Sequence, residues 1–181
     1  MTRLSPLDTS SFTEEEAAIH THVLTVPHNP TGPTAIWSRS PELCRAALDF
    51  GDFIRFRSTV DPRVRELSIC VTAAHYSSEN EWAAHAPQAE RAGVPPHVLE
   101  AIHAGQVPQF DDERDELAWQ VATELHRDHT LTDRTWELAQ ARWGDRGMVE
   151  LISTVGFYSM VALLLNGTKA ELNPPRPAQQ H

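Results

Sequence analysis

Apolar residues recur every three to four positions along most of the chain, which is the period of an amphipathic α-helix. Val64, Leu67 and Val71 follow this period in one segment, and Val121 and Leu125 follow it in another. No segment shows a convincing alternation of apolar and polar residues, the pattern of a half-buried β-strand. The hydrophobic pattern therefore predicts an all-α chain.

Residues suited to helix ends divide this pattern into elements. Asp61 is an N-cap residue before Pro62, a proline suited to the first helical position, and Ser78 and Glu81 have the spacing of a capping box. Gly93 suits the C′ position, just beyond the end of a helix. We expect helices at about 13–25, 40–57, 61–76, 79–92, 96–104, 111–128, 132–143 and 146–166, with breaks at 27–33, 93–96, 105–110 and 144.

The expected helices form one domain with an extension at each end. We expect a helical arm and loop at 1–35, a compact multi-helix domain at 36–170, and a proline-rich, disordered tail at 171–181. The last helix, 146–166, is so rich in apolar residues that it should be buried on most sides. Its longest apolar run, Met160 to Leu165, is far too short to cross a bilayer, so we expect no membrane partner.

The composition indicates a globular protein with a modest core. Of 181 residues, 40% are hydrophobic and 7% are aromatic, so we expect burial to be completed against other copies of the chain in a homo-oligomer. The formal net charge of −10 repels phosphate backbones, which argues against nucleic acid as a partner. The N-terminal sequence lacks the basic and apolar regions of a secretory signal, so we expect a cytoplasmic protein.

The two cysteines, Cys44 and Cys70, are far apart and lie in apolar helical patterns. A disulfide framework, a Cys-x-x-Cys redox pair and a cysteine-based zinc site are therefore not expected. Both thiols are interpreted as small, buried apolar side chains.

The densest group of candidate chemical residues includes Glu81 and His85. They are four residues apart on one expected helix, so their side chains share a face. A carboxylate beside an imidazole orients the ring and raises its basicity, which suits a general base or a proton shuttle. Glu66 lies on the preceding helix, and the very short turn between the two helices predicts antiparallel packing that brings Glu66 toward this face.

Residues at this turn could line the same pocket, namely His75, Tyr76 and Ser78. Trp82 could serve as a platform for a substrate, although a tryptophan at this position is more typical of core or interface packing.

Purely structural interpretations also remain open. Ser78 and Glu81 fit an ordinary capping box, and Glu81 and His85 fit an ordinary surface pair at helical spacing. His126 and His129 are three residues apart and could bind a metal, but no third ligand with clear spacing appears, so a surface pair is preferred.

Several of these residues form motifs with a characteristic order and spacing. The motifs are Arg65-Glu66-Leu67, Tyr76, Glu81-Trp82-x-x-His85-x-x-x-Ala89-x-x-x-Gly93-Val94, and Val149-Glu150-Leu151-Ile152-x-x-x-Gly156-Phe157-Tyr158. Their order and spacing resemble the carboxymuconolactone decarboxylase/alkylhydroperoxidase-D-like superfamily over roughly residues 35–167. The resemblance implies an all-helical fold and a homo-oligomer, commonly a trimer or hexamer with a dimer as the alternative, and sites near subunit contacts.

The chain departs from the peroxidase branch that it resembles. That branch has a Cys-x-x-Cys pair, a histidine four residues after the second cysteine and a glutamate twelve residues before the first. Carried over, the cysteines fall on Ser78 and Glu81, the histidine falls on His85 and the glutamate falls on Glu66. Peroxide reduction there needs a thiolate and a resolving thiol, so the resemblance does not imply a thiol peroxidase.

The decarboxylase branch, by resemblance, uses no cofactor and removes CO₂ from a carboxylated lactone. The implied roles are proton transfer by His85, orientation of its ring by Glu81 or Glu66, a hydrogen bond to a carbonyl from Ser78 or Tyr76, and carboxylate binding by Arg63 or Arg65. The resulting hypothesis is a cofactor-free acid/base enzyme, most simply a lyase acting on a small organic acid or lactone.

Two alternatives stand beside this hypothesis. The chain could be a non-catalytic, oligomeric module that binds a small molecule or a partner protein. A weaker alternative is a metal-dependent enzyme that uses His75, His85 and a glutamate as ligands.

Overall fold

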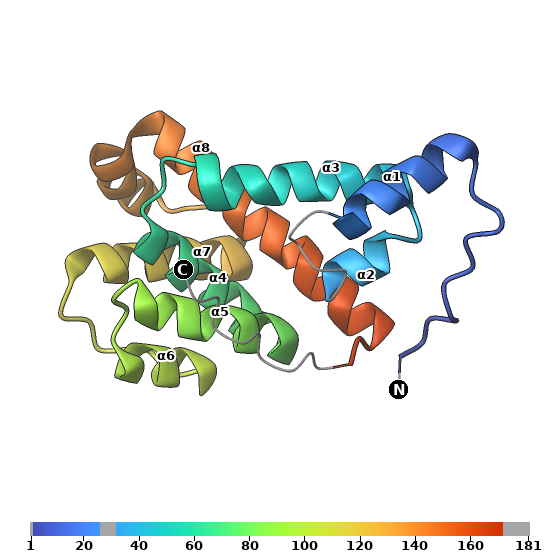
Figure 1. Ribbon diagram of the computed structural model, residues 1–181. Coiled ribbons are helices and arrows are strands. Elements are labelled where there is room, and N and C mark those ends of the chain that lie inside the picture. Colours follow the sequence, from blue (N-terminus) through green and yellow to red (C-terminus); the bar gives the residue numbers. More distant parts are fainter. Residues whose placement is uncertain (1, 26–31, 172–181) are drawn as a thin grey trace.

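A computed structural model describes residues 2–25 and 32–171, and every regular element in these residues is a helix (Figure 1). The elements are α1 (Glu14–Thr25), α2 (Pro33–Trp37), α3 (Pro41–Asp52), the π-helical turn η1 (Phe53–Arg57), α4 (Pro62–His75), α5 (Glu79–Arg91), α6 (Pro96–His103), α7 (Glu113–Asp128) and α8 (Asp133–Thr168). The predicted all-α class is confirmed.

The largest differences from the predicted boundaries lie around α2, α3 and α8. Pro33 begins the short helix α2, whereas we had predicted a loop at 27–33, of which residues 27–31 lie outside the described part of the chain. The helix predicted at 40–57 is α3 followed by a π-helical turn. The two last predicted helices are the two arms of α8, which bends at Gly144 because this residue has a φ of 66° that a glycine adopts without strain.

The predicted helix ends are confirmed at Asp61 and Gly93 but not at Ser78. The Asp61 side chain accepts a hydrogen bond from the backbone N–H two residues later, and Gly93 has a φ of 97° at the end of α5. The capping box predicted from Ser78 and Glu81 is wrong, because the Ser78 side chain makes no cap hydrogen bond. The Glu81 carboxylate lies near His85 instead.

Two apolar cores share the helices α4 and α8. The first core joins α4, α5, α6, α7 and the first half of α8, and the second joins α1, α2, α3 and η1 to the second half of α8. Leu67 belongs to the first core and Ile69 to the second, and both side chains are fully buried. Burial of each contributes roughly 1.5–3 kcal/mol to folding.

The N-terminal helix is part of the second core rather than separate from it. Ile19 and Val23 of α1 are buried in the second core, and α1 packs against α3. The boundaries of 1–35, 36–170 and 171–181 remain predictions, and residues 172–181 of the expected tail lie outside the described part of the chain.

The helix α8 is longer than the sequence pattern indicated. By length and composition alone it could cross a membrane, in contrast to our expectation from its short apolar run. However, 56% of its most apolar window is buried against the rest of the chain, as in the core helix of a globular protein. Its place in both cores is sufficient to account for its apolar character, and a cytoplasmic location remains an expectation.

Candidate active site

A glutamate of α4 and a histidine of α5 form a buried pair. As the short turn between these helices predicted, Glu66 and His85 lie side by side, with 2.7 Å between Glu66 Oε2 and His85 Nδ1. The exposed fractions of Glu66 and His85 are 3% and 7%. The other carboxylate oxygen of Glu66 accepts a hydrogen bond of 3.1 Å from Arg65 Nε, so this carboxylate has two partners.

The second nitrogen of the His85 ring faces another buried carboxyl group. Glu81 Oε2 lies 3.8 Å from His85 Nε2, too far for a direct hydrogen bond but close enough for a strong electrostatic interaction. The ring of Tyr158, from α8, packs edge-on against the imidazole at 4.8 Å. We call Glu66, Glu81 and His85 the acid/base cluster.

The environment moves the pKa values of the two glutamates in opposite directions. Burial alone would raise the pKa of Glu66, but the hydrogen bond to His85 and the positive charges of His85 and Arg65 together lower it. Burial raises the pKa of Glu81, and His85 and Arg55 offset only part of this effect. The surroundings therefore favour the ionised form of Glu66 and the neutral form of Glu81, a separation of pKa values typical of acid/base sites.

The protonation of Glu66 determines which nitrogen of His85 can exchange a proton. An ionised carboxylate only accepts hydrogen bonds, so His85 Nδ1 must carry the proton that bonds to Glu66. His85 Nε2 is then the nitrogen that gives or takes a proton, on the side of Glu81. The cluster thus has the parts of a general acid/base system.

Ser78, the N-cap residue of α5, comes three residues before Glu81 and seven before His85, a spacing that places it on their side of the helix. Its side chain is 1% exposed, and its Oγ has no hydrogen-bond partner among the described residues. A buried hydroxyl without a partner costs about 1–3 kcal/mol. This hydroxyl is therefore available to a ligand that reaches the cluster.

His75 and Tyr76, which we had expected to line the same pocket, lie elsewhere. His75 comes nine residues after Glu66, which places it on the opposite side of α4. Its ring stacks on His126 of α7 at 4.5 Å, and the Tyr76 ring packs edge-on against both imidazoles. The ligand set of the metal-dependent alternative is therefore not brought together, because His75 and His85 lie on opposite sides of α4.

The prediction of a surface pair at His126 and His129 is wrong. His126 is buried, and its Nε2 lies 3.0 Å from the hydroxyl oxygen of Thr72. The apolar period of α7 turns His126 toward α4 and leaves His129, the residue after the helix, exposed.

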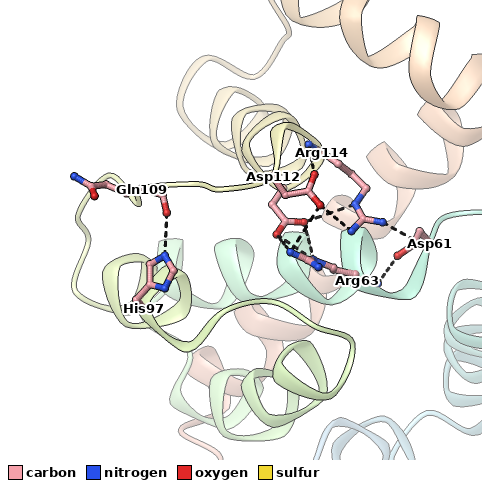
Figure 2. A network of polar contacts seen from close by, with 7 residues as sticks. Asp61, Arg63, His97, Gln109, Asp112 and Arg114 are labelled. Atoms are coloured by element: carbon pink, nitrogen blue, oxygen red, sulfur yellow. Dashed lines mark hydrogen bonds and ion pairs between the residues drawn. The ribbon is translucent and has the colours of Figure 1, made fainter.

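Trp82 and Arg63 also face other parts of the molecule. The Trp82 ring stacks on His103 of α6 at 4.3 Å and packs against the first core. The guanidinium of Arg63 pairs with Asp115 of α7 through Nε, at 3.0 Å, and through Nη2. Figure 2 shows Arg63 within a network that includes Asp112 and joins the start of α4 to the start of α7. Arg63 therefore holds helices together and does not reach the acid/base cluster.

Sequence reasoning missed one charged residue beside the cluster. The positive charge of Arg55, in the π-helical turn η1, acts on both Glu81 and Tyr158. A π-helical turn changes the helical register, so the apolar period of α3 does not predict which way residues 53–57 face.

The acid/base cluster is buried within the single chain. Two open hollows on the surface lie elsewhere, one lined by Glu137 and Asp145 of α8 and the other by Leu125 and Trp136 between α7 and α8. Neither hollow is lined by a residue of the acid/base cluster. The expected homo-oligomer remains a prediction, because the structure describes one chain.

Comparison with known proteins supports the fold and the family. Residues 41–124, which include the acid/base cluster, match the model of the Carboxymuconolactone decarboxylase family. A search of curated proteins gave no significant match.

Two of the solved structures that match this chain show the same fold. An uncharacterized peroxidase-related protein from Silicibacter sp. TM1040 has a TM-score of 0.74 and 15% identity, over 95% of this chain and 92% of that one. A second structure, titled alkylhydroperoxidase AhpD core, is an uncharacterized peroxidase-related protein from Ralstonia eutropha JMP134, with a TM-score of 0.73 and 12% identity over the same shares. At these identities the similarity shows the fold alone.

Proposed function

Because residues 41–124 match the model of the Carboxymuconolactone decarboxylase family and the chain has the fold of two peroxidase-related proteins, we propose that the chain is a member of the carboxymuconolactone decarboxylase/alkylhydroperoxidase-D-like superfamily and a cofactor-free acid/base enzyme. The simplest form of this function is a decarboxylase that acts on a small carboxylated lactone or keto acid. The observation that carries the proposal is the buried acid/base cluster, in which His85 lies between Glu66, whose pKa is lowered, and Glu81, whose pKa is raised.

The proposed reaction breaks the bond between the substrate carboxylate and its neighbouring carbon. CO₂ leaves, and the electron pair of the broken bond moves into the adjacent carbonyl group to give an enolate. Glu81 gives its proton to His85 Nε2, which delivers it to the carbon of the enolate, and after product release a proton from solvent returns to Glu81. Glu66 holds the imidazole in its tautomer, and the Ser78 hydroxyl donates a hydrogen bond to the developing oxyanion.

Thiol peroxidase chemistry is not part of the proposal. Ser78 and Glu81 stand where the resemblance to the peroxidase branch places the two cysteines. Cys44 and Cys70 are free but buried, and burial raises the pKa of both thiols. A thiol with a raised pKa is a poor nucleophile at neutral pH.

The test is CO₂ release from carboxymuconolactone, acetoacetate and oxaloacetate by the wild type and by His85→Ala. His97→Ala is the matched control, because His97 is an exposed histidine of α6. We expect His85→Ala to lose a factor on the order of 10²–10⁴ in turnover, the usual contribution of a general acid/base group. The control should keep wild-type turnover, and circular dichroism establishes that both variants are folded.

A folded His85→Ala protein with full turnover would contradict the proposed site. If the wild type binds these compounds but converts none of them, the result supports the alternative of a non-catalytic small-molecule-binding module.

A further inference from the structure

The π-helical turn η1 lies directly before the segment that leads into α4. Such turns are rare and occur frequently at functional sites, because the extra residue redirects the side chains of the turn. In η1 the turn carries Arg55, and its backbone is tied to the acid/base cluster: Arg65 donates one hydrogen bond of 3.0 Å to the Arg55 carbonyl oxygen and another to Glu66.

The Arg55 guanidinium is held in place by α3. Its Nε donates a hydrogen bond of 3.3 Å to the carbonyl oxygen of Gly51. A Cβ atom at Gly51 would lie 3.4 Å from Arg55 Nη2 and 3.2 Å from the Phe157 ring. The absence of a side chain at Gly51 thus leaves room for the guanidinium between α3 and α8.

The Arg55 side chain is more exposed to solvent than the cluster. It is 33% exposed, whereas that of Glu81 is 7% exposed. Arg65 bonds both to the Arg55 carbonyl oxygen and to Glu66, which places η1 against the cluster. Burial raises the pKa of Glu81 and of Tyr158, and the positive charge of Arg55 offsets part of this effect at both groups. Arg63 and Arg65, the two arginines that the sequence suggested for carboxylate binding, are instead paired with Asp115 and Glu66.

We propose that Arg55 binds the carboxylate of a small anionic substrate at the solvent side of the acid/base cluster. The inference rests on the proposed function and names the charge that its substrate must carry. Asp52 Oδ1 lies 3.5 Å from Arg55 Nη2, with both side chains one-third exposed. An incoming carboxylate therefore competes with Asp52 for the guanidinium, whose planar fork suits two-point binding of a carboxylate.

The proposal is tested by binding of a stable ligand pair, so that it does not depend on turnover. The probes are 5-oxotetrahydrofuran-2-carboxylate and its uncharged carboxamide, titrated calorimetrically into the full-length protein. We expect the wild type to prefer the carboxylate and Arg55→Met to lose about tenfold or more in affinity for it, the effect of about 1.4 kcal/mol. The carboxamide should bind both proteins equally.

Three further variants sharpen the measurement. Arg57→Met removes a neighbouring arginine of the same turn, whose guanidinium bonds to the Asp49 carbonyl oxygen, and should bind like the wild type. Arg55→Lys keeps the charge but not the fork, so its affinity should be intermediate. Asp52→Asn removes the competing carboxylate and should bind the carboxylate probe more tightly than the wild type.

Wild-type affinity in a folded Arg55→Met protein would overturn the proposal. The same conclusion follows if the wild type does not bind the carboxylate probe, or if sulfate binds as tightly as the probe and Arg55 therefore holds an adventitious anion only. These outcomes are distinct from failure of the proposed function, which is read from CO₂ release by the His85→Ala protein. The wild type can prefer the carboxylate probe even if it releases no CO₂, and it can release CO₂ even if Arg55 does not bind the substrate carboxylate.

Discussion

Two histidines are buried on opposite sides of α4, and they differ in what their rings contact. His85 is 7% exposed and His126 is 9% exposed. The nitrogens of the His85 ring face the carboxyl groups of Glu66 and Glu81. The His126 ring contacts the hydroxyl group of Thr72 and stacks on another imidazole.

The contrast shows that charged partners, and not burial, decide what a buried imidazole can do. Burial, together with the charges of His75 and His129, lowers the pKa of His126 to about 4, so this ring is neutral at physiological pH. The Glu66 carboxylate beside His85 instead accepts the hydrogen bond at Nδ1 and orients the ring. His126 is therefore suited to packing, and His85 is suited to proton transfer.

The largest effect is expected on the free energy of unfolding, from a change beside His85. Glu66→Ala leaves His85 buried without its carboxylate, and we expect a loss of about 3–5 kcal/mol in the free energy of unfolding. Urea denaturation measures it. Glu66→Gln, which keeps the shape and can still accept a hydrogen bond, is the control and should lose less. A loss below about 1 kcal/mol in Glu66→Ala would mean that the pair does not hold α4 and α5 together.

The second largest effect is expected in the pH dependence of stability, to which His126 contributes. The folded protein binds the His126 proton only near pH 4, whereas the unfolded chain binds it near the ordinary pKa of 6.5. The unfolded state therefore holds more protons between these values, so stability is complete above pH 6.5 and falls as the pH drops toward 4. The shift corresponds to about 3 kcal/mol.

The measurement is the free energy of unfolding of the wild type and of His126→Asn from pH 4 to 7. The variant should lack this part of the pH dependence. Parallel curves for the two proteins would show that His126 is protonated alike in the folded and unfolded states.

A smaller effect, of opposite sign, is expected at Glu81. Because the folded protein raises the pKa of this carboxyl group above 4.5, its contribution to stability is complete below pH 4.5 and is lost as the pH rises through the folded pKa. Glu81→Gln removes that cost and should raise stability at pH 7 by about 0.5–2 kcal/mol, while proton transfer to His85 is lost. Thermal unfolding at pH 7 and at pH 4 checks this, since the gain should be absent at pH 4.

The smallest effect is expected at Thr72. Thr72→Val preserves the shape of the side chain and removes the hydroxyl group that contacts His126 Nε2. We expect a loss of about 1 kcal/mol in urea denaturation and no change in CO₂ release. A large loss of turnover would show that the His126 region contributes to the reaction and would remove the contrast between the two histidines.

Local patterns were sufficient for most of the fold and for part of the site. Apolar residues at helical spacing predicted the all-α class, and the four-residue spacing of Glu81 and His85 placed them on one face of α5. The short turn before α5 predicted the approach of Glu66, because antiparallel neighbours joined by a short turn must pack together. These features depend on contacts between residues close in sequence.

Tertiary structure decided the features that depend on which side of a helix meets which neighbour. The sequence placed His75 with His85, whereas packing of α4 against α7 stacks His75 on His126. The sequence suggested Arg63 for carboxylate binding. In the structure the Arg63 guanidinium pairs with Asp115, which lies 52 residues further along the chain.

The position of Arg55 beside Glu81 was likewise decided by tertiary structure, because it depends on a π-helical turn that no periodic pattern predicts. The sequence by itself determined the helices and the pairing of Glu81 with His85, since spacing along a helix is a local property. Only the folded chain determined the opposite shifts in the pKa values of Glu66 and Glu81, because pKa values depend on burial and on charges brought from other helices.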